Sequence, residues 1–146
     1  MSAQIGHLDR ESALAGLRPW AQPAPPISGD EYQARIERAR ALMRAQGVDA
    51  LLVGAGASLR YFAGVPWGAS ERLVAMLLTA SGDPLLVCPA FEEGSLDAVL
   101  RVPAGKRLWE EHEDPHALVA QAMAERGARS LALDPAAAFA VHTGLR

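Results

Sequence analysis

Four histidines and one cysteine are the side chains of this 146-residue chain best suited to bind a metal or act as a nucleophile. His112 and His116 are four residues apart, a spacing that places two metal ligands on one face of a helix. Asp114-Pro115 lies between them and is expected to start a helix there, so the two histidines do not share a turn. The zinc-peptidase pattern HExxH is absent. We therefore expect the acids from Glu110 to Asp114 to form a solvated turn and this chain to hold no metal.

Nucleophilic catalysis finds no better support. Cys88 lies in an apolar stretch that predicts a strand, where a buried thiol packs as a small hydrophobe and keeps a high pKa. The serines fall in predicted turns, and the G-x-S-x-G elbow of hydrolases is missing. Gly54-Ala55-Gly56 begins like a dinucleotide-binding fingerprint, but Leu59 occupies the place of the third glycine. These glycines are expected to form a tight bend, and no catalytic residue is predicted.

The segment from Tyr61 to Arg72 is the best candidate for a binding region. It combines Tyr61 and Phe62 with Trp67 in a loop, followed by the charged pair Glu71-Arg72. Tryptophan at the tip of a loop is common at binding surfaces and unusual in a solvated turn. In the alternative interpretation, the first two aromatic residues belong to the core and Trp67 packs on its own domain. Arg72 would then form only a surface ion pair with Glu71.

The elements that would position this loop begin with an amphipathic helix. Ser28 and Glu31 have the spacing of a capping box, and Gly47 supplies the left-handed stop. The apolar face of the helix recurs at helical spacing: Tyr32, Ile36, Ala39 and Met43. Most of the remaining positions are charged and are predicted to form a solvated face: Arg35, Glu37, Arg38 and Arg44.

Short apolar runs then predict a series of buried strands: 49–53, 73–79, 85–88, 106–110 and 130–133. Ser81-Gly82-Asp83-Pro84 is a turn signal that predicts an antiparallel hairpin between the second and third of them. Asp114 is expected to cap a helix with Pro115 at its first position, and Gly127 to end it. An alanine-rich helix is predicted to follow the last strand. This order predicts an α/β fold with a mixed β-sheet flanked by helices.

The chain divides into an arm and one domain. Residues 1–27 are predicted to be a Pro-rich N-terminal arm, because four prolines between Arg18 and Pro26 favour extended backbone, with Trp20 available as an anchor on a neighbouring surface. Residues 28–146 are predicted to be a single domain, since no repeat or linker interrupts them.

Composition excludes several classes of function. A net charge of -3 gives no reason to expect nucleic acid or an anionic membrane as partner. No apolar run approaches the ~20 residues needed to cross a bilayer, and the first residues lack a hydrophobic signal core. The single cysteine is consistent with a reducing compartment. A cytoplasmic protein is expected.

The order of these motifs resembles the N-terminal domain of the creatinase/prolidase/aminopeptidase P family, the pita-bread metallopeptidases, and bacterial Xaa-Pro dipeptidases in particular. The resemblance extends from Asp30 to Arg146. Its matching pieces are GVDALLV (47–53), LRYFAG (59–64), ER (71–72), SGDP (81–84) and VCPAFE (87–92). It implies the family's ribonuclease H-like N-terminal layer, with the catalytic pita-bread domain beyond Arg146.

The resemblance also implies partners and a role. Such hydrolases use two divalent metals, manganese or cobalt, held by aspartates, a histidine and glutamates of the catalytic domain, and none of those ligands can be assigned here. The N-terminal domain is then non-catalytic, contacts its own C-terminal catalytic domain, builds a homodimer, and helps to shape the entrance for Xaa-Pro peptides. Trp67, Tyr61 and Arg72 would be substrate-proximal residues acting on the neighbouring subunit. The alternative is a stand-alone protein-interaction module with the same fold and no peptidase activity.

Overall fold

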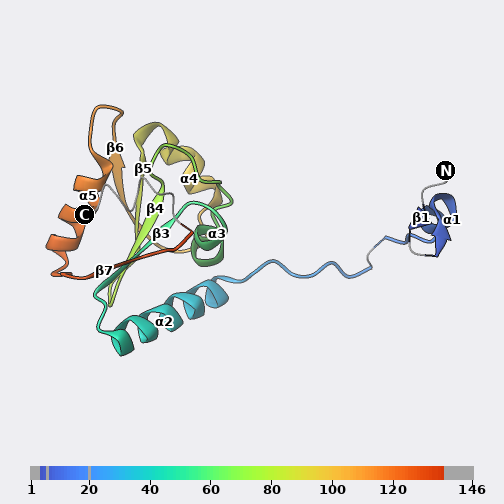
Figure 1. Ribbon diagram of the computed structural model, residues 1–146, viewed down its shortest axis with the longest axis horizontal. Coiled ribbons are helices and arrows are strands. Elements are labelled where there is room, and N and C mark those ends of the chain that lie inside the picture. Colours follow the sequence, from blue (N-terminus) through green and yellow to red (C-terminus); the bar gives the residue numbers. More distant parts are fainter. Residues whose placement is uncertain (1–3, 6, 20, 137–146) are drawn as a thin grey trace.

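A five-stranded mixed sheet forms the centre of the computed structural model, which describes residues 4–5, 7–19 and 21–136 (Figure 1). The strands lie in the order β6-β5-β4-β3-β7. Their bounds are β3 Ala50–Gly54, β4 Ala75–Thr79, β5 Leu85–Pro89, β6 Gly105–Trp109 and β7 Leu131–Leu133. β4 is antiparallel to both neighbours, whereas β3–β7 and β5–β6 are parallel pairs. The predicted hairpin and mixed sheet are therefore confirmed.

Both faces of the sheet are covered by helices. On one face, β4 presents Met76 and Leu78 to helices α2 (Gly29–Gln46), α3 (Ala57–Ala63) and α4 (Glu93–Val99). On the other face, β4 presents Ala75 and Leu77 to helix α5 (Pro115–Glu125), through Val119 and other apolar side chains. Because successive strand residues point to opposite faces, a strand covered on both sides is apolar throughout.

Helix α2 begins and ends where the sequence indicates. The Ser28 hydroxyl accepts a hydrogen bond from the Glu31 backbone N–H at 3.2 Å, and Gly47 ends the helix with φ 66°. Only half of the predicted capping box forms, because the Glu31 carboxylate pairs with the Arg35 guanidinium. Helix α5 likewise starts at Pro115, after the cap supplied by Asp114.

The structure corrects three sequence-based expectations. The segment around Tyr61 is helix α3 and not an aromatic turn, and α4 with the short 3-10 helix η1 (Ala90–Glu92) was not predicted. Neither α3 nor α4 has a side-chain N-cap hydrogen bond, since Gly56 and Glu92 occupy the cap positions, so the sequence carries no start signal there. Arg35, predicted to be solvated, is 9% exposed.

Arg35 is buried because α3 lies against α2. Its Nη1 donates to the Tyr61 backbone carbonyl at 2.8 Å, and its guanidinium lies 4.3 Å from the Tyr61 ring centroid and 5.2 Å from that of Tyr32. The side chain thus caps the carboxyl-terminal half of α3 and stacks between two aromatic rings, which a helical wheel of α2 alone cannot reveal.

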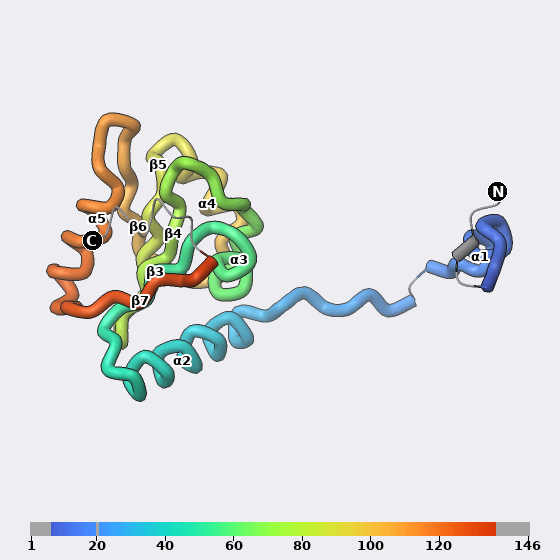
Figure 2. Tube along the Cα trace, viewed as in Figure 1, coloured from blue at the N-terminus to red at the C-terminus, as the bar shows by residue number. Residues whose placement is uncertain are grey.

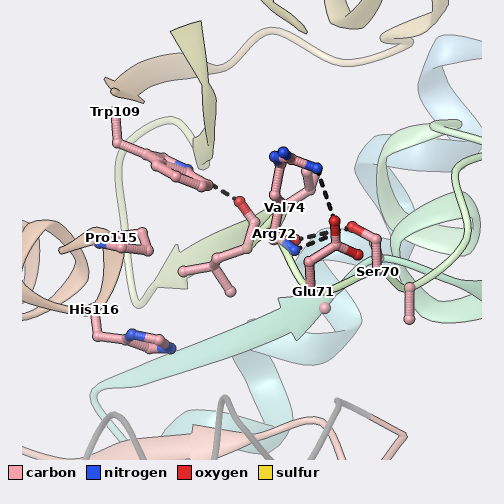
Figure 3. A pocket seen from close by; sticks show the side chains of 11 residues that line it. Ser70, Glu71, Arg72, Val74, Trp109, Pro115 and His116 are labelled. Carbon is pink, nitrogen blue, oxygen red and sulfur yellow. Dashed lines mark hydrogen bonds and ion pairs between the residues drawn. The ribbon is translucent and has the colours of Figure 1, made fainter. Parts of the chain in front are cut away.

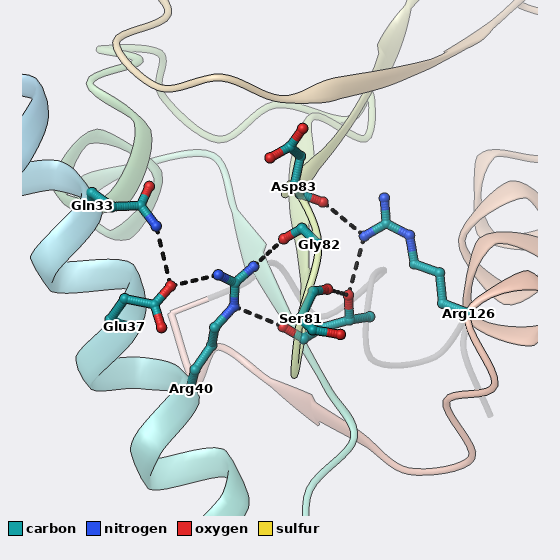
Figure 4. A network of polar contacts seen from close by, with 8 residues as sticks. Gln33, Glu37, Arg40, Ser81, Gly82, Asp83 and Arg126 are labelled. Carbon is teal, nitrogen blue, oxygen red and sulfur yellow. Dashed lines mark hydrogen bonds and ion pairs between the residues drawn. The ribbon is translucent and has the colours of Figure 1, made fainter.

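Two arginines hold the turn between β4 and β5 from opposite faces (Figure 4). Arg40 of α2 donates from Nε to the Thr79 carbonyl at 3.0 Å and from Nη2 to the Gly82 carbonyl. Arg126, after α5, donates from Nη1 to the Asp83 carbonyl at 2.9 Å. The turn carbonyls at this end of the sheet are therefore satisfied by side chains.

Asp49 ties the start of β3 to the start of β7. Its carboxylate accepts backbone N–H bonds from Arg129 at 2.8 Å and Ser130 at 2.9 Å, and its own N–H donates to the Ser130 hydroxyl at 2.9 Å. These hydrogen bonds, first that from the Arg129 N–H, lower the pKa of Asp49 below its ordinary value.

Stability at acid pH is expected to depend on Asp49. Because its folded pKa lies below its unfolded pKa of about 3.9, its contribution is complete above that value and is lost as pH falls through the folded pKa. Asp49→Asn should therefore flatten the acid limb of a plot of unfolding free energy against pH, measured by urea denaturation. Asp83→Asn, at an exposed turn, is the matched control. Parallel acid limbs for wild type and Asp49→Asn would contradict the assignment.

The N-terminal residues form a small separate unit. It contains β1 (Gln4–Ile5), β2 (Leu8–Asp9) and α1 (Arg10–Ala15), which were not predicted. Figures 1 and 2 show residues 21–28 as an extended segment leading away from the sheet domain. Trp20 and residues 137–146, which include most of the segment predicted to form an alanine-rich helix, lie outside the described residues.

Candidate functional site

One edge of the sheet gathers the carboxyl ends of four strands. β3, β5, β6 and β7 run in the same direction and therefore end together, and the antiparallel β4 begins at that edge, where Ala75 pairs with Gly54. The segment of residues 64–74, between α3 and β4, arrives at the same place. In open α/β sheets this carboxyl edge is where ligands bind. We call it the carboxyl edge.

Gly64 directs the chain from α3 into this segment. Its φ is 76°, and an added Cβ would lie 2.3 Å from Cγ of Arg101. The Arg101 backbone N–H donates to the Ala63 carbonyl at 2.9 Å, which holds the two segments together. Val65 follows, completely buried. The path toward Trp67 is thus fixed by backbone contacts at its start.

The aromatic residues of the segment are placed differently. Trp67 and Phe62 are partly buried and pack against the core beneath α2, α3 and α4, as the alternative interpretation of the sequence anticipated. Tyr61 is 44% exposed, although its ring is held by Arg35 and its hydroxyl accepts from Arg38 Nη2 at 3.3 Å. Tyr61 therefore faces α2, while Trp67 as a residue is partly exposed.

Arg72 lies at the carboxyl edge and links three segments. Its Nη1 pairs with Glu71 at 2.7 Å and its Nε with Glu111 at 2.6 Å, and its guanidinium lies 5.8 Å from the Phe91 ring centroid. The hydrogen bond to Glu111 is the main reason that the pKa of Arg72 is raised. The Arg72 side chain is 42% exposed, so solvent screens its ion pairs with Glu71 and Glu111. These ion pairs orient the side chains and add little to the stability of the fold.

A pocket of about 250 Å³ opens beside Arg72. Figure 3 shows Trp109, Pro115 and His116 on one side and the Ser70–Val74 segment on the other. The Trp109 indole N–H donates to the Leu73 carbonyl at 3.1 Å, which fixes one wall. His116 Nδ1 lies 3.3 Å from Asp114 Oδ1, while the buried Nε2 has no hydrogen-bond partner among the described residues.

Of the three predicted site residues, only Arg72 lines this pocket. Tyr61 contacts the arginines of α2, and Trp67 packs on the core above the other face of the sheet. The sequence did not indicate Trp109 and His116 as pocket residues. Their placement depends on β6 pairing with β5 in parallel, a long-range contact that no local motif announces.

Metal and thiol chemistry have no site in the described part of the chain. No group of three or more His, Cys, Asp or Glu side chains is arranged there to hold a metal ion. His112 precedes α5 and does not share its face with His116, as expected. Burial raises the pKa of the Cys88 thiol to about 11, which keeps it protonated and unreactive. No described helix has the length and apolarity to cross a membrane.

Comparison with known proteins gives a consistent set of relatives. Residues 35–146 match the family model of the Creatinase/Prolidase N-terminal domain. The probable dipeptidase PepE of Mycobacterium tuberculosis is 31% identical over 95 residues, which are 64% of this chain and 25% of that protein. The chain thus spans a quarter of the length of the curated relative it matches.

Solved structures show the same fold. The dipeptidase PepE of Mycobacterium ulcerans superposes with a TM-score of 0.69 at 28% identity, over 83% of this chain and 34% of that chain. The Creatinase/Prolidase N-terminal domain of an X-Pro dipeptidase from Streptococcus pyogenes gives a TM-score of 0.65 at 15% identity, over 77% of this chain and 85% of that chain. The second is a domain solved by itself, so this fold forms without a catalytic domain attached.

Proposed function

We infer, because the chain belongs to the Creatinase/Prolidase N-terminal domain family, that it is the non-catalytic N-terminal domain of an Xaa-Pro dipeptidase. The observation that carries this inference is the family match over residues 35–146, supported by the fold shared with the PepE dipeptidase of M. ulcerans. Burial keeps the Cys88 thiol protonated, and the described residues hold no group of three or more metal-ligating side chains. The hydrolytic chemistry is therefore assigned to a C-terminal catalytic domain.

The catalytic domain would supply two divalent metals, manganese or cobalt, that activate a water and polarise the scissile carbonyl. None of the described side chains fits such a pair, so no step of the reaction is assigned to them. This domain would bind and orient the substrate and cover the entrance to the active site. We propose that it does so in the cytoplasm as part of a homodimer, at the entrance to a neighbouring subunit's active site.

Trp67 and Arg72 are the residues we assign to that entrance, and Tyr61 is the weaker candidate because its ring is already held by Arg35. Trp67, which is partly exposed, would offer a prolyl ring an apolar wall, which suits a substrate group without an N–H to recognise. Arg72, fixed by Glu71 and Glu111, offers a cation at the same edge of the sheet.

Trp67→Ala is expected to lower kcat/KM for an Ala-Pro dipeptide several-fold in the full-length enzyme, because the prolyl ring would lose its apolar wall. Steady-state kinetics measures the effect, and thermal unfolding of the same sample shows whether the fold is intact. Leu42→Ala, an exposed position on α2, is the control. Unchanged kinetics for Trp67→Ala in a folded protein would reject the role.

The division of labour between domains has its own test. The 146-residue chain, incubated with Mn²⁺ and Ala-Pro, is expected to release no proline, whereas the full-length protein should release it at a measurable rate. Turnover by the isolated chain would show that the chemistry resides in these residues. Absence of turnover by the metal-loaded full-length protein would refute the assignment to Xaa-Pro dipeptidases.

A further inference from the structure

We propose that the carboxyl edge is the surface on which the catalytic domain docks, with Phe91 inserted into an apolar socket that has a basic rim. The proposal rests on the proposed function and adds to it the contact residues and the chemistry of the partner surface. Four features of this edge support it: an exposed aromatic side chain, an acidic surround, a pocket, and an orienting arginine.

Phe91 is the aromatic anchor. It is 63% exposed, and among the described residues after the arm only Leu42 is an equally exposed large hydrophobic. Phe91 belongs to η1, the short 3-10 helix at the carboxyl end of β5, so its backbone is fixed between a strand and helix α4. A rigid, exposed aromatic residue loses little conformational entropy on binding and is typical of the energetic centre of an interface.

The surroundings of Phe91 are acidic. Arg72 lies near its ring, and the carboxylates that act on Arg72 are Glu111, Glu71 and Glu92. One cation thus stands among three acids, and the exposed loop after β6 adds Glu110 and Glu113. A partner that covers Phe91 must approach through this negative field, which favours a surface carrying lysine or arginine.

Arg72, whose guanidinium lies near the Phe91 ring, also lines the pocket at this edge. The walls of the pocket are mostly apolar, from Val74, Trp109 and Pro115, and the buried Nε2 of His116 in it has no hydrogen-bond partner within residues 4–5, 7–19 and 21–136. An exposed aromatic side chain beside a preformed pocket is a surface that can fit closely against a partner.

The length of the relatives indicates which partner would cover the carboxyl edge. This chain spans 25% of PepE from M. tuberculosis and 34% of the M. ulcerans chain, so most of such a protein lies outside the matched domain. Leu42, equally exposed, lies near the other end of the sheet: it follows Arg40, which contacts the β4–β5 turn. Phe91 and Leu42 are therefore equally exposed but lie at opposite ends of the sheet strands. Leu42 can serve as an internal control for Phe91.

Hydroxyl-radical footprinting with mass spectrometry tests the proposal on unmodified protein, since both phenylalanine and leucine side chains are oxidised when solvent reaches them. The 146-residue chain and the full-length protein are compared, since the S. pyogenes N-terminal domain, which has the same fold, was solved as a domain by itself. The oxidation rate of Phe91 is expected to fall at least ~5-fold in the full-length protein, as for a side chain at the dry centre of an interface. The rate of Leu42 should change less than ~2-fold.

Equal Phe91 rates in the two proteins would overturn the docking proposal, as would equal protection of both residues. Ala-Pro hydrolysis by the same full-length sample is measured in parallel. Protection of Phe91 without hydrolysis would support docking and refute the dipeptidase function. Hydrolysis without protection would support the function and refute docking at this edge.

Discussion

Gly64→Ala is expected to lower the free energy of unfolding by about 3 kcal/mol. The backbone at Gly64 has φ 76°, a left-handed conformation that costs a residue with a Cβ about 1–2 kcal/mol. The new Cβ would also lie 2.3 Å from Cγ and 2.9 Å from Cβ of Arg101. Those are stem atoms and not the mobile end of the side chain, so the backbone must move to relieve the overlap.

Chemical denaturation of the 146-residue chain measures this effect. Gly68→Ala in the same segment is the control, because nothing lies within 4 Å of its added Cβ, and its expected change is within about 0.5 kcal/mol. Similar stability losses for the two variants would contradict the proposed strain. The proposed function predicts that Gly64→Ala also reduces kcat/KM of the complete dipeptidase, since the segment that it misplaces carries Trp67.

Arg40→Ala is expected to cost about 2–3 kcal/mol of stability, because it leaves two turn carbonyls without donors. The Arg40 side chain is 8% exposed, and its guanidinium serves the carbonyls of Thr79 and Gly82. Its ion-pair partner Glu37 is 50% exposed, so water hydrates the Glu37 carboxylate when the arginine is removed. The loss is thus one of backbone hydrogen bonding between α2 and the β4–β5 turn (Figure 4).

The same denaturation experiment distinguishes this explanation from a loss of packing. Arg40→Met keeps the apolar stem without the donors, and it is expected to recover only a minor part of the lost stability. Arg44→Ala, at an exposed position in the last turn of α2, should change stability by less than about 0.5 kcal/mol. Full recovery by Arg40→Met would contradict the role of the guanidinium.

Elements with local signals were predictable from sequence, and elements without them were not. Ser28, Asp114 and Gly47 mark helix ends through hydrogen bonds and backbone conformation within a few residues. Helix α3 has such a signal only at its end, where Gly64 is left-handed: Gly56 opens it without a side-chain cap, and Arg35 reaches its carboxyl end from another helix. The apolar strands were recognisable because both faces of the sheet are covered.

The candidate site was predictable only in part, for a similar reason. The sequence indicated the segment from Tyr61 to Arg72, but the neighbours of Arg72 come from distant segments. Glu111 lies 39 positions along the chain from Arg72, and Trp109 lies 36 positions from Leu73. Such contacts are set by the parallel pairing of β5 with β6 and by the path of α5 across the opposite face of the sheet.

We propose that these residues act as one domain of a larger dipeptidase. The mass of the native protein, determined after capture from its own cells with an antibody raised against this domain, tests this proposal. The proposed function predicts a species much heavier than 15.5 kDa that releases proline from Ala-Pro. A native species of 15.5 kDa would contradict it and would make Phe91 and Trp67 candidate contacts of a stand-alone interaction module.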